Sequence, residues 1–457
     1  MRSLGLALLV GVGACVAVAG LDDLQFGPGG GGVGGRATGG AGPEGGFGGS
    51  GGAAIDLVFT DDELDGEFGE GTFQGTSWAV DHVALEGTEK GAFTSRVFDA
   101  GQAVRWEELE WEPGGPYGRP LPDDEDFEVG YLAGNVSMDH NVLLLHFDEP
   151  AGVLPDGAVI TESSGQLLAV KITGTEMGLA TGVLGNALDD SLTGYAFTPA
   201  GDGTPLNFGN RDYSWSYWVN TTQSCPSANP PNGNRVHLGV EETTGDETHL
   251  WLGCSTSDTN CTAPGSGFGA GTFRHAVGDS AGPCGTTVIN DGEWHHLVVV
   301  NTASNGGDLR LYVDGQLDDA VTHSYTTPAD LQAGVEFAIG AFSTGTYQST
   351  GLFDEVAVFD RALDAEEVAA IFARGALRLE LQVRVCDEPD CSDDPAFVGD
   401  GTNDVILDPG PDGSPAVFLP AALPVGQYFQ YRVAFSRLAT AAVSPELFEV
   451  TVYAALP

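Results

Sequence analysis

Short runs of β-branched and aromatic residues, separated by glycine, asparagine, aspartate and proline, recur from residue 55 to the C-terminus. Runs of this length that are bounded by turn residues are typical of β-strands. Between residues 309 and 317, the pair Asp314-Gly315 separates two apolar runs and predicts a tight hairpin. The pattern as a whole predicts an all-β protein.

Two segments depart from a plain strand pattern. Residues 104–111 alternate apolar and polar positions, but a one-residue shift predicts a bulge, with Val104 and Trp106 on one face and Leu109 and Trp111 on the other. Residues 365–372 instead have helical spacing and predict a short helix, for which the N-cap is Asp364 and the C-terminal stop is Gly375.

Three motifs in the second half of the chain occur in a characteristic order. They are Gly292-Glu293-Trp294-His295-His296 before an apolar run, then Leu309-Arg310-Leu311-Tyr312-Val313-Asp314-Gly315, then Phe353-Asp354-Glu355-Val356 with the following residues up to Leu363. This series resembles the LamG-like jellyroll domains of the concanavalin A-like lectin/glucanase superfamily, in the form found in bacterial exported lipoproteins. The resemblance extends back to about Asn141, and it implies a jellyroll β-sandwich over residues 138–375.

Strand patterns also occur on both sides of the jellyroll, in residues 54–131 and 376–457. Neither side has enough strands to complete a sandwich by itself. We therefore expect the two segments to form one smaller β-sandwich into which the jellyroll is inserted, because insertions at loop tips are tolerated. The alternative is two small β-units that flank the jellyroll.

The N-terminal residues have the layout of an export signal. Residues 1–20 carry one charge, at Arg2, before an apolar run that is too short to span a membrane. Val12-Gly13-Ala14-Cys15 resembles a bacterial lipobox, which implies that Cys15 is lipidated. The alternative is cleavage after Ala17-Val18-Ala19, which would release a secreted protein. Residues 21–53 form a glycine-rich flexible linker. We expect an outer-membrane or cell-surface lipoprotein.

Six cysteines remain after either kind of processing, and an even number in an exported protein predicts disulfides. Cys386 and Cys391 are separated by four residues and predict a local disulfide at the end of a strand. The other four can pair in three ways, among which the sequence does not choose: Cys225, Cys254, Cys261 and Cys284.

The charge of the chain excludes several kinds of partner. There are 65 acidic residues against 17 basic ones, for a net charge of −48. Such a surface repels phosphate backbones and anionic headgroups, so nucleic acid is not an expected partner. We expect membrane contact only through a lipid anchor.

Aromatic residues of the jellyroll are the candidate ligand-binding groups. Tyr213, Trp215 and Tyr217 alternate along one predicted strand and share a face, which lies either exposed for stacking on sugars or in the core. Trp251 and Tyr347 are further candidates.

The resemblance also implies a calcium site. Some jellyrolls of this type hold calcium between loop oxygens and acidic residues near the two ends of the domain. Glu162, where the family often has aspartate, and Asp354 are the implied metal ligands in this chain. Asp354 and Glu355 are expected to face opposite ways on their strand, and a hydrogen-bonding role for Asp354 is the alternative.

The sequence predicts no catalytic site. Glu63, Asp65 and Glu67 have the spacing of glycoside hydrolase carboxylates, but they lie outside the jellyroll in an acidic, glycine-rich run. His295 and His296 start a strand and face opposite ways, so they do not form a metal pair. We expect a non-catalytic protein that recognises an extracellular glycan or a surface protein. A glycan-cleaving enzyme of the same superfamily and a purely structural surface protein are the alternatives.

Overall fold

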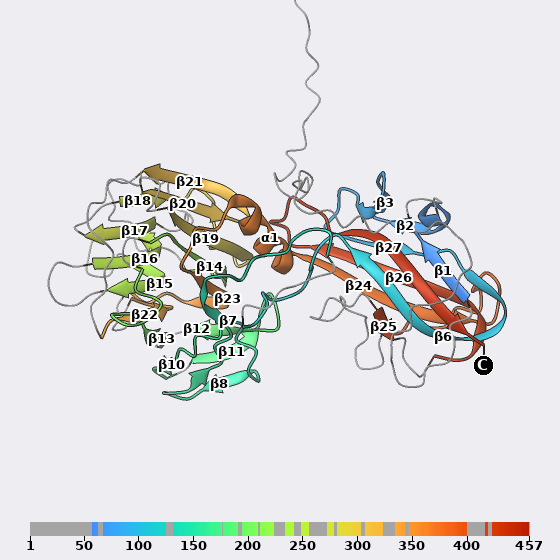
Figure 1. Cartoon of the computed structure of the whole chain (residues 1–457), viewed down its shortest axis with the longest axis horizontal. Coiled ribbons are helices and arrows are strands. Elements are labelled where there is room, and N and C mark those ends of the chain that lie inside the picture. The colour runs from blue at the N-terminus through green and yellow to red at the C-terminus, as the bar shows by residue number, and fades with distance from the viewer. Residues whose placement is uncertain are drawn as a thin grey trace, which may run out of the picture.

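The computed structural model describes residues 57–62, 67–124, 131–175, 177–190, 194–208, 211–223, 234–241, 248–255, 272–277, 281–302, 307–322, 334–342, 347–399, 416–418 and 423–456. These residues form two β lobes that lie side by side along the long axis of the molecule, with a short helix between them (Figure 1). The prediction of an all-β protein with a jellyroll and a second β-sandwich is confirmed.

The jellyroll lobe consists of two antiparallel sheets. The nine-stranded sheet has the order β21 (Gln316–Thr322), β20 (Asp308–Val313), β19 (Trp294–Thr302), β14 (Tyr213–Asn220), β23 (Gly351–Phe359), β12 (Asn186–Asp190), β11 (Met177–Thr181) and β8 (Gly152–Leu154). Its ninth strand, β7 (Asn141–Leu145), lies outside this order and pairs with β23. The eight-stranded sheet has the order β18 (Ala281–Cys284), β17 (Thr272–Val277), β16 (Thr248–Ser255), β15 (Asn234–Glu241), β22 (Glu336–Ile339), β13 (Tyr195–Pro199), β10 (Val170–Thr173) and β9 (Val159–Ile160).

Turn chemistry connects two of these strands as predicted. Val313 pairs with Gln316, so Asp314 and Gly315 form a two-residue loop between β20 and β21. Both loop residues have positive φ angles, 52° for Asp314 and 74° for Gly315. This conformation follows the right-handed twist of the strands, and glycine adopts it without steric cost.

The helix α1 (Ala365–Ala376) covers the outer face of the nine-stranded sheet. Asp364 accepts a hydrogen bond from the Glu367 backbone N–H, and the Glu367 side chain accepts one from the Asp364 N–H, which is a complete capping box. Val368 and Ile371 of the helix pack against Val298, Val300 and other residues of the sheet. None of the helices among the described residues has the length and apolar character needed to cross a bilayer.

Gly375 does not end the helix, so this part of the prediction is wrong. The helix continues to Ala376, and Leu377 is its C-cap. The reason for glycine is instead a close contact, because a Cβ at residue 375 would lie 2.4 Å from Cζ2 of the buried Trp218.

The second lobe is a ten-stranded sheet that encloses one buried apolar cluster between its two halves, and its strands come from both ends of the chain. The described pairings join β2 (Thr72–Gln74), β5 (Lys90–Thr94), β26 (Gly426–Arg437), β6 (Phe98–Pro113), β27 (Glu446–Ala455), β4 (Val83–Leu85) and β3 (Thr76–Trp78) in that order. Outside this order, β1 (Leu57–Asp61) pairs with β27, β24 (Leu377–Cys386) with β26, and β25 (Ala416–Phe418) with β6, while the 3-10 helix η1 spans Glu67–Glu70.

The long strand β6 turns from one half of this lobe to the other. Its first residues pair with β26 and residues 105–113 pair with β27. Consecutive residues of β27 pair with Trp106 and Glu108, so a bulge at Glu107 is present as predicted. The predicted change of face is wrong, because Val104, Trp106, Leu109 and Trp111 all belong to one buried cluster.

Candidate functional site

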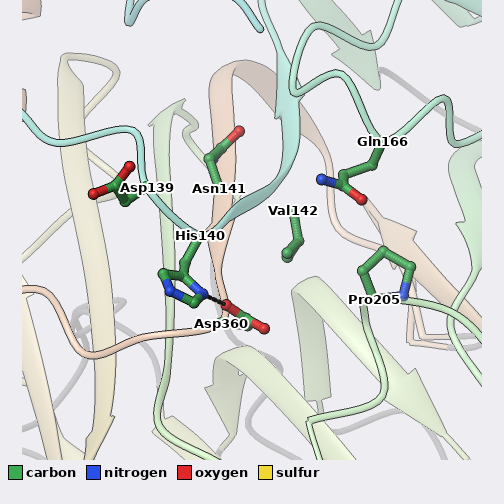
Figure 2. A pocket seen from close by; sticks show the side chains of 7 residues that line it. All are labelled: Asp139, His140, Asn141, Val142, Gln166, Pro205 and Asp360. Atoms are coloured by element: carbon green, nitrogen blue, oxygen red, sulfur yellow. Dashed lines mark hydrogen bonds and ion pairs between the residues drawn. The ribbon is translucent and has the colours of Figure 1, made fainter. Parts of the chain in front are cut away.

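A pocket of about 330 Å³ opens at one edge of the jellyroll lobe (Figure 2). Its polar lining residues are Asp139, His140, Asn141, Gln166 and Asp360, and its apolar lining residues are Val142 and Pro205. Asp139, His140 and Gln166 are exposed, whereas Asn141 and Val142 are buried. The pocket therefore presents several hydrogen-bonding groups beside a small apolar wall.

Strand pairing at the edge of the nine-stranded sheet positions one side of the pocket. Val358 of β23 pairs with Leu143 and Phe359 pairs with Asn141, which leaves Val142 as the extra residue of a bulge. The Asn141 side-chain amide donates to the carbonyl oxygens of Leu143 and Val358, both at 3.2 Å. These bonds fix the backbone on which Asp139 to Val142 are held.

Loops of the eight-stranded sheet position the other side. Gln166 lies in the loop between β9 and β10, and Pro205 follows β13. The backbone N–H of Gln166 donates to Oγ of Ser164 at 3.3 Å, which shapes this loop. The pocket thus combines residues from four separate parts of the sequence.

Asp360 is the charged centre of the pocket. Its Oδ1 lies 2.7 Å from Nδ1 of His140, and its Oδ2 is paired with the Arg211 guanidinium. Arg211 also donates to the Phe208 carbonyl oxygen at 3.2 Å, which holds the guanidinium in place. Both oxygens of Asp360 are therefore engaged by charge-assisted hydrogen bonds.

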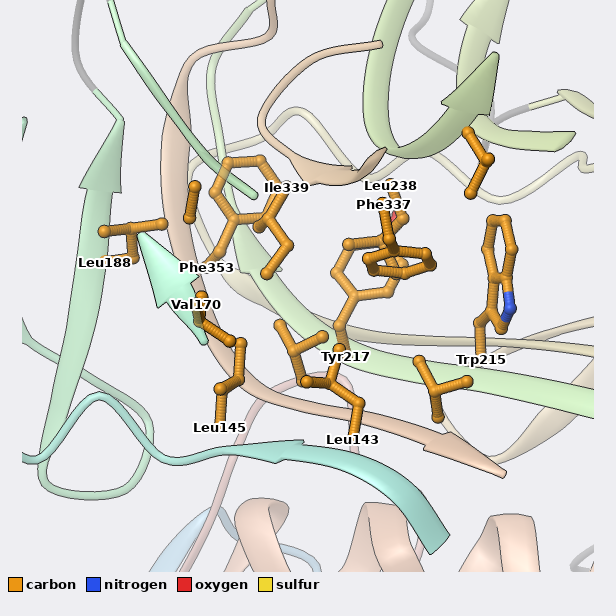
Figure 3. Packing of buried hydrophobic residues seen from close by; sticks show 14 of the residues in the cluster. Leu143, Leu145, Val170, Leu188, Trp215, Tyr217, Leu238, Phe337, Ile339 and Phe353 are labelled. Atoms are coloured by element: carbon orange, nitrogen blue, oxygen red, sulfur yellow. The ribbon is translucent and has the colours of Figure 1, made fainter. Parts of the chain in front are cut away.

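The aromatic row predicted on β14 lies in the core. Trp215 and Tyr217 have no exposed surface, and they pack between the two sheets with Phe337 and Phe353 (Figure 3). The Tyr217 hydroxyl and Nδ1 of His237 are 2.8 Å apart inside this core. The ligand-binding role expected for Trp215 and Tyr217 is therefore wrong, because an exposed ligand does not reach a fully buried ring.

The two other aromatic candidates lie on or beside the eight-stranded sheet. Trp251 pairs with Gly239 and Arg274 in the ladder, and its side chain is outside the described part of the structure. Tyr347 is half-buried, and its ring is 5.8 Å from that of Phe342. A binding role for either residue stays a prediction.

The two predicted metal ligands have different backbone partners. Oε1 of Glu162 accepts from the N–H groups of Leu144 and Ser164, at 3.2 and 2.8 Å. Oδ2 of Asp354 accepts from the Leu184 N–H at 3.0 Å. In the described ranges, no group of three or more His, Cys, Asp or Glu side chains is arranged to hold a metal ion. The calcium site stays a prediction.

Phe353 and Val356 are three positions apart and both enter the core, so alternation is broken at the buried pair Asp354 and Glu355, and the expectation that these two face opposite ways is wrong. Glu355 has a φ of 48°, and the pairing of β23 with β14 shifts register between Ser216 and Trp218. The resulting bulge turns both carboxyl groups away from the core that Phe353 and Val356 enter. Burial raises the pKa of Asp354 well above its usual range.

Glu355 forms a buried ion-pair network with His146. Nδ1 of His146 lies 2.8 Å from Oε1 of Glu355, and Nε2 lies 3.0 Å from Oδ1 of Asp123. Burial alone would lower the pKa of His146, but the charges and hydrogen bonds of Glu355 and Asp123 outweigh it and raise this pKa to about 10. The imidazolium is therefore charged at neutral pH and joins β7, β23 and the segment that precedes the jellyroll.

The paired histidines have separate environments. His295 Nδ1 lies 2.8 Å from Asp314 Oδ2, whereas His296 Nε2 lies 2.9 Å from the Ser216 hydroxyl. Burial lowers the pKa of His296 to about 3, so this ring is neutral. Among the three carboxylates of the 63–67 run, Glu63 and Asp65 are outside the described residues, and Glu67 pairs with Arg96 at 2.7 Å.

The structure contains the predicted disulfide between Cys386 and Cys391, which are 5.2 Å apart at Cα. The remaining cysteine predictions lie outside the described residues or concern side chains that the structure does not describe: Cys15, Cys225, Cys254, Cys261 and Cys284. Their lipidation or pairing stays a prediction.

Sequence reasoning missed the pocket residues. Asp360 belongs to the third motif, and Asn141 to the opening strand, but their contact depends on the pairing of β7 with β23. His140 has a φ of 65°, a conformation that no sequence pattern in this region indicates. The one feature of the sequence that could have indicated the pocket is the pair of polar residues, Asp139 and His140, directly before Asn141.

Comparison with known proteins finds a family match within the jellyroll lobe. Residues 190–369 match the model of the concanavalin A-like lectin/glucanases superfamily. No curated protein matches the chain. Domain 4 of the arabinanase AbnA from Geobacillus stearothermophilus, solved with arabinotriose, is similar over 49% of this chain and 99% of its own, with 18% identity and a TM-score of 0.34.

Two further solved structures have similar scores. Trypanosoma rangeli sialidase is 20% identical over 52% of this chain and 33% of its own, with a TM-score of 0.35. The binding domain of botulinum neurotoxin DC, solved in complex with SialylT, is 12% identical over 54% of this chain and 58% of its own, with a TM-score of 0.36.

Proposed function

We propose that the chain uses its jellyroll lobe, in which residues 190–369 match the concanavalin A-like lectin/glucanases superfamily, to recognise glycans without cleaving them. The observation that carries this proposal is the polar pocket at the jellyroll edge. Its volume of about 330 Å³ is at the low end of the range for small-molecule sites, which suits a terminal sugar residue rather than a long chain.

The pocket chemistry suits sugar hydroxyl groups, which both donate and accept hydrogen bonds. The Asp139 carboxylate is an acceptor, and the Gln166 amide has one acceptor and two donors. Val142 and Pro205 supply the apolar surface that contacts the C–H groups of a sugar ring. A fixed carboxylate at Asp360, held by Arg211 and His140, orients the remaining hydroxyls.

The overall charge favours uncharged glycans. With a net charge of −48, the chain repels polyanions over distances of about a Debye length, which is ~10 Å at moderate salt. Two arginines contact residues that line the pocket, and both charges are already paired: Arg211 with Asp360, and Arg361, which donates to the Asp139 carbonyl oxygen, with Glu367. A neutral terminal sugar is therefore the ligand class that we propose.

The contacts of Asp360 support binding without hydrolysis. A glycoside hydrolase needs one carboxyl group that is protonated and able to donate to the leaving oxygen. Both oxygens of Asp360 already accept from His140 and Arg211, so the carboxyl group is placed as an acceptor rather than as a donor to a leaving oxygen. The alternative is a glycan-cleaving enzyme that uses Asp139 and Asp360, and the appearance of shorter products from neutral oligosaccharides would establish it.

Calorimetric titration of the purified protein with a panel of neutral monosaccharides and oligosaccharides tests the proposal. Asp139→Ala and Gln166→Ala remove exposed polar groups of the pocket without disturbing the Asp360 ion pairs. Each should weaken binding by about tenfold, the effect of losing one hydrogen bond to a ligand. Glu86→Ala, an exposed change on the other lobe, is the control and should bind as the wild type does.

We also propose that the glycan is bound at the cell surface, with the protein anchored through Cys15. The resemblance of residues 12–15 to a lipobox supports this proposal. Mass spectrometry of the mature N-terminus tests it. A lipid-modified Cys15 is expected, and a chain that begins after Ala19 would show ordinary secretion instead.

A further inference from the structure

Beyond the pocket, the outer face of the eight-stranded sheet is open to solvent over β9, β10 and β13. Val159 of β9 is 63% exposed, and residues 171, 173, 195, 197 and 199 are exposed or half-buried in strict alternation with buried neighbours. The buried neighbours Ile172 and Ala196 face the core. The open face therefore consists of the alternate side chains of these strands that point away from the core.

Two aromatic rings stand next to each other on this face. Tyr195 and Phe197 occupy alternate positions of β13, and their ring centroids are 5.7 Å apart at an interplanar angle of 47°. Lys171 pairs directly with Phe197, and Thr173 pairs with Tyr195, on the neighbouring strand β10. The face thus combines two tilted rings with two hydrogen-bonding side chains, Lys171 and Thr173. Lys171 is one of the two lysines in the sequence, the other being Lys90.

The loops at one end of these strands contribute residues to the pocket. Because β10 and β13 are antiparallel, the residues before β10 and those after β13 lie at the same end of the sheet. Gln166 precedes β10 and Pro205 follows β13, and both line the pocket. Along β13, Phe197 is closer to that end than Tyr195, so the two rings extend away from the pocket.

We propose that Phe197 and Tyr195 form an extended subsite for the neutral oligosaccharide chain whose terminal residue occupies the pocket. The inference rests on the proposed function and adds that the ligand is a chain of several sugar residues. The apolar face of a sugar ring stacks on an aromatic ring, and the tilt between the two rings suits a chain that twists from one residue to the next. Lys171 and Thr173 donate to hydroxyl groups at the rim of each ring.

The competing role for these rings is structural, because aromatic neighbours on a sheet also stabilise strand pairing. The two roles differ in what they predict for ligand length. A structural pair affects the unfolding midpoint and leaves the preference for longer ligands unchanged. A subsite affects only ligands that are long enough to reach it.

The test compares arabinose, xylose and galactose with the corresponding linear tetrasaccharides, titrated into the purified wild-type protein and into Phe197→Ala and Tyr195→Ala. We expect wild type to bind one tetrasaccharide roughly tenfold or more tighter than its monosaccharide. Each aromatic variant should lose roughly five- to tenfold of the tetrasaccharide affinity and none of the monosaccharide affinity. Val153→Ala, an 82% exposed apolar residue on the other sheet, is the matched control and should retain the full preference.

The outcomes separate this inference from the proposed function. Equal affinity for both ligand lengths in wild type, or an unchanged preference in both aromatic variants, would overturn the subsite and leave the pocket intact. Failure of the wild type to bind any of the six probes would overturn the pocket and the subsite together. Phe197→Leu keeps an apolar side chain without a ring face, so its loss of the preference supports stacking even where the alanine variant unfolds.

Discussion

Replacing Gly375 with alanine tests the packing between α1 and β14, because two opposing effects can be weighed. Alanine is favoured over glycine inside a helix by about 1 kcal/mol. The new Cβ, however, would lie 2.4 and 2.6 Å from two indole carbons of Trp218 and 3.0 Å from its Nε1. These contacts are shorter than any that real Cβ atoms make, so either the helix or the indole must move.

Trp218 has little freedom to move. Its ring is stacked on Phe372 at 5.6 Å and lies 5.1 Å from the His296 ring, and only 1% of its surface is exposed. Overpacking a site of this kind costs about 1 to 3 kcal/mol, and at this overlap we take the upper part of the range. After subtraction of the helix-propensity gain, Gly375→Ala should lower the free energy of unfolding by about 1 to 2 kcal/mol.

Urea unfolding followed by tryptophan fluorescence measures this change. The matched experiment is Gly375→Ala in a Trp218→Phe background, where the smaller ring removes the overlapping atoms. There, the alanine should be neutral or stabilising relative to Trp218→Phe alone. A Gly375→Ala variant that is as stable as wild type or more stable would refute the reasoning, because it would mean that the helix does not lie against Trp218 as described.

Three further predictions concern stability and ligands. The folded-state pKa of His146 is about 10, against 6.5 for a free histidine, so its stabilising contribution is complete below pH ~6.5 and is lost as pH rises to about 10. His146→Gln should remove this pH dependence from the free energy of unfolding measured between pH 6 and 10. Parallel pH curves for the variant and the wild type would contradict the prediction. Reduction of the Cys386–Cys391 disulfide, or Cys386→Ser, should lower the free energy of unfolding by about 2 kcal/mol, because the unfolded chain gains loop entropy. Thermal unfolding measures this change, and a loss above about 5 kcal/mol would contradict an effect limited to loop entropy. If Glu162 and Asp354 hold calcium, chelation should lower the thermal midpoint, and no shift would remove this site.

The strand and helix pattern of the chain could be predicted from its sequence because local turn chemistry and periodicity determine it. The Asp314-Gly315 hairpin, the Asp364 cap and the local disulfide are examples, since each depends on neighbours within a few residues. The resemblance of the three motifs indicated the jellyroll for the same reason, because each motif is a strand with its own turn.

Features that depend on long-range packing were predicted poorly. Alternation on β14 shows that Trp215 and Tyr217 share a face, but it does not show that the second sheet covers that face. The bulge at Glu355 reverses the direction of a carboxyl group, and it arises from pairing with β14 rather than from local sequence. Gly375 has the sequence position of a helix stop, yet its role is set by a tryptophan more than 150 positions earlier.

The pocket depends on long-range packing more than any other feature of the fold, so the sequence alone did not predict it. Its residues come from four segments that are brought together only when β7 pairs with β23 and the two sheets close. No single segment has a motif for binding. Asp360 is informative only beside His140 and Arg211, which lie 220 and 149 positions away in the sequence.

The measurement that tests the account most directly is a glycan-array screen of the wild-type protein beside Gln166→Ala, with calcium and again with a chelator. The account predicts that wild type binds a set of neutral glycans that share one terminal sugar, and that the variant loses the same set. Wild-type binding to no glycan in either condition, or identical profiles for the two proteins, would contradict glycan recognition by the pocket.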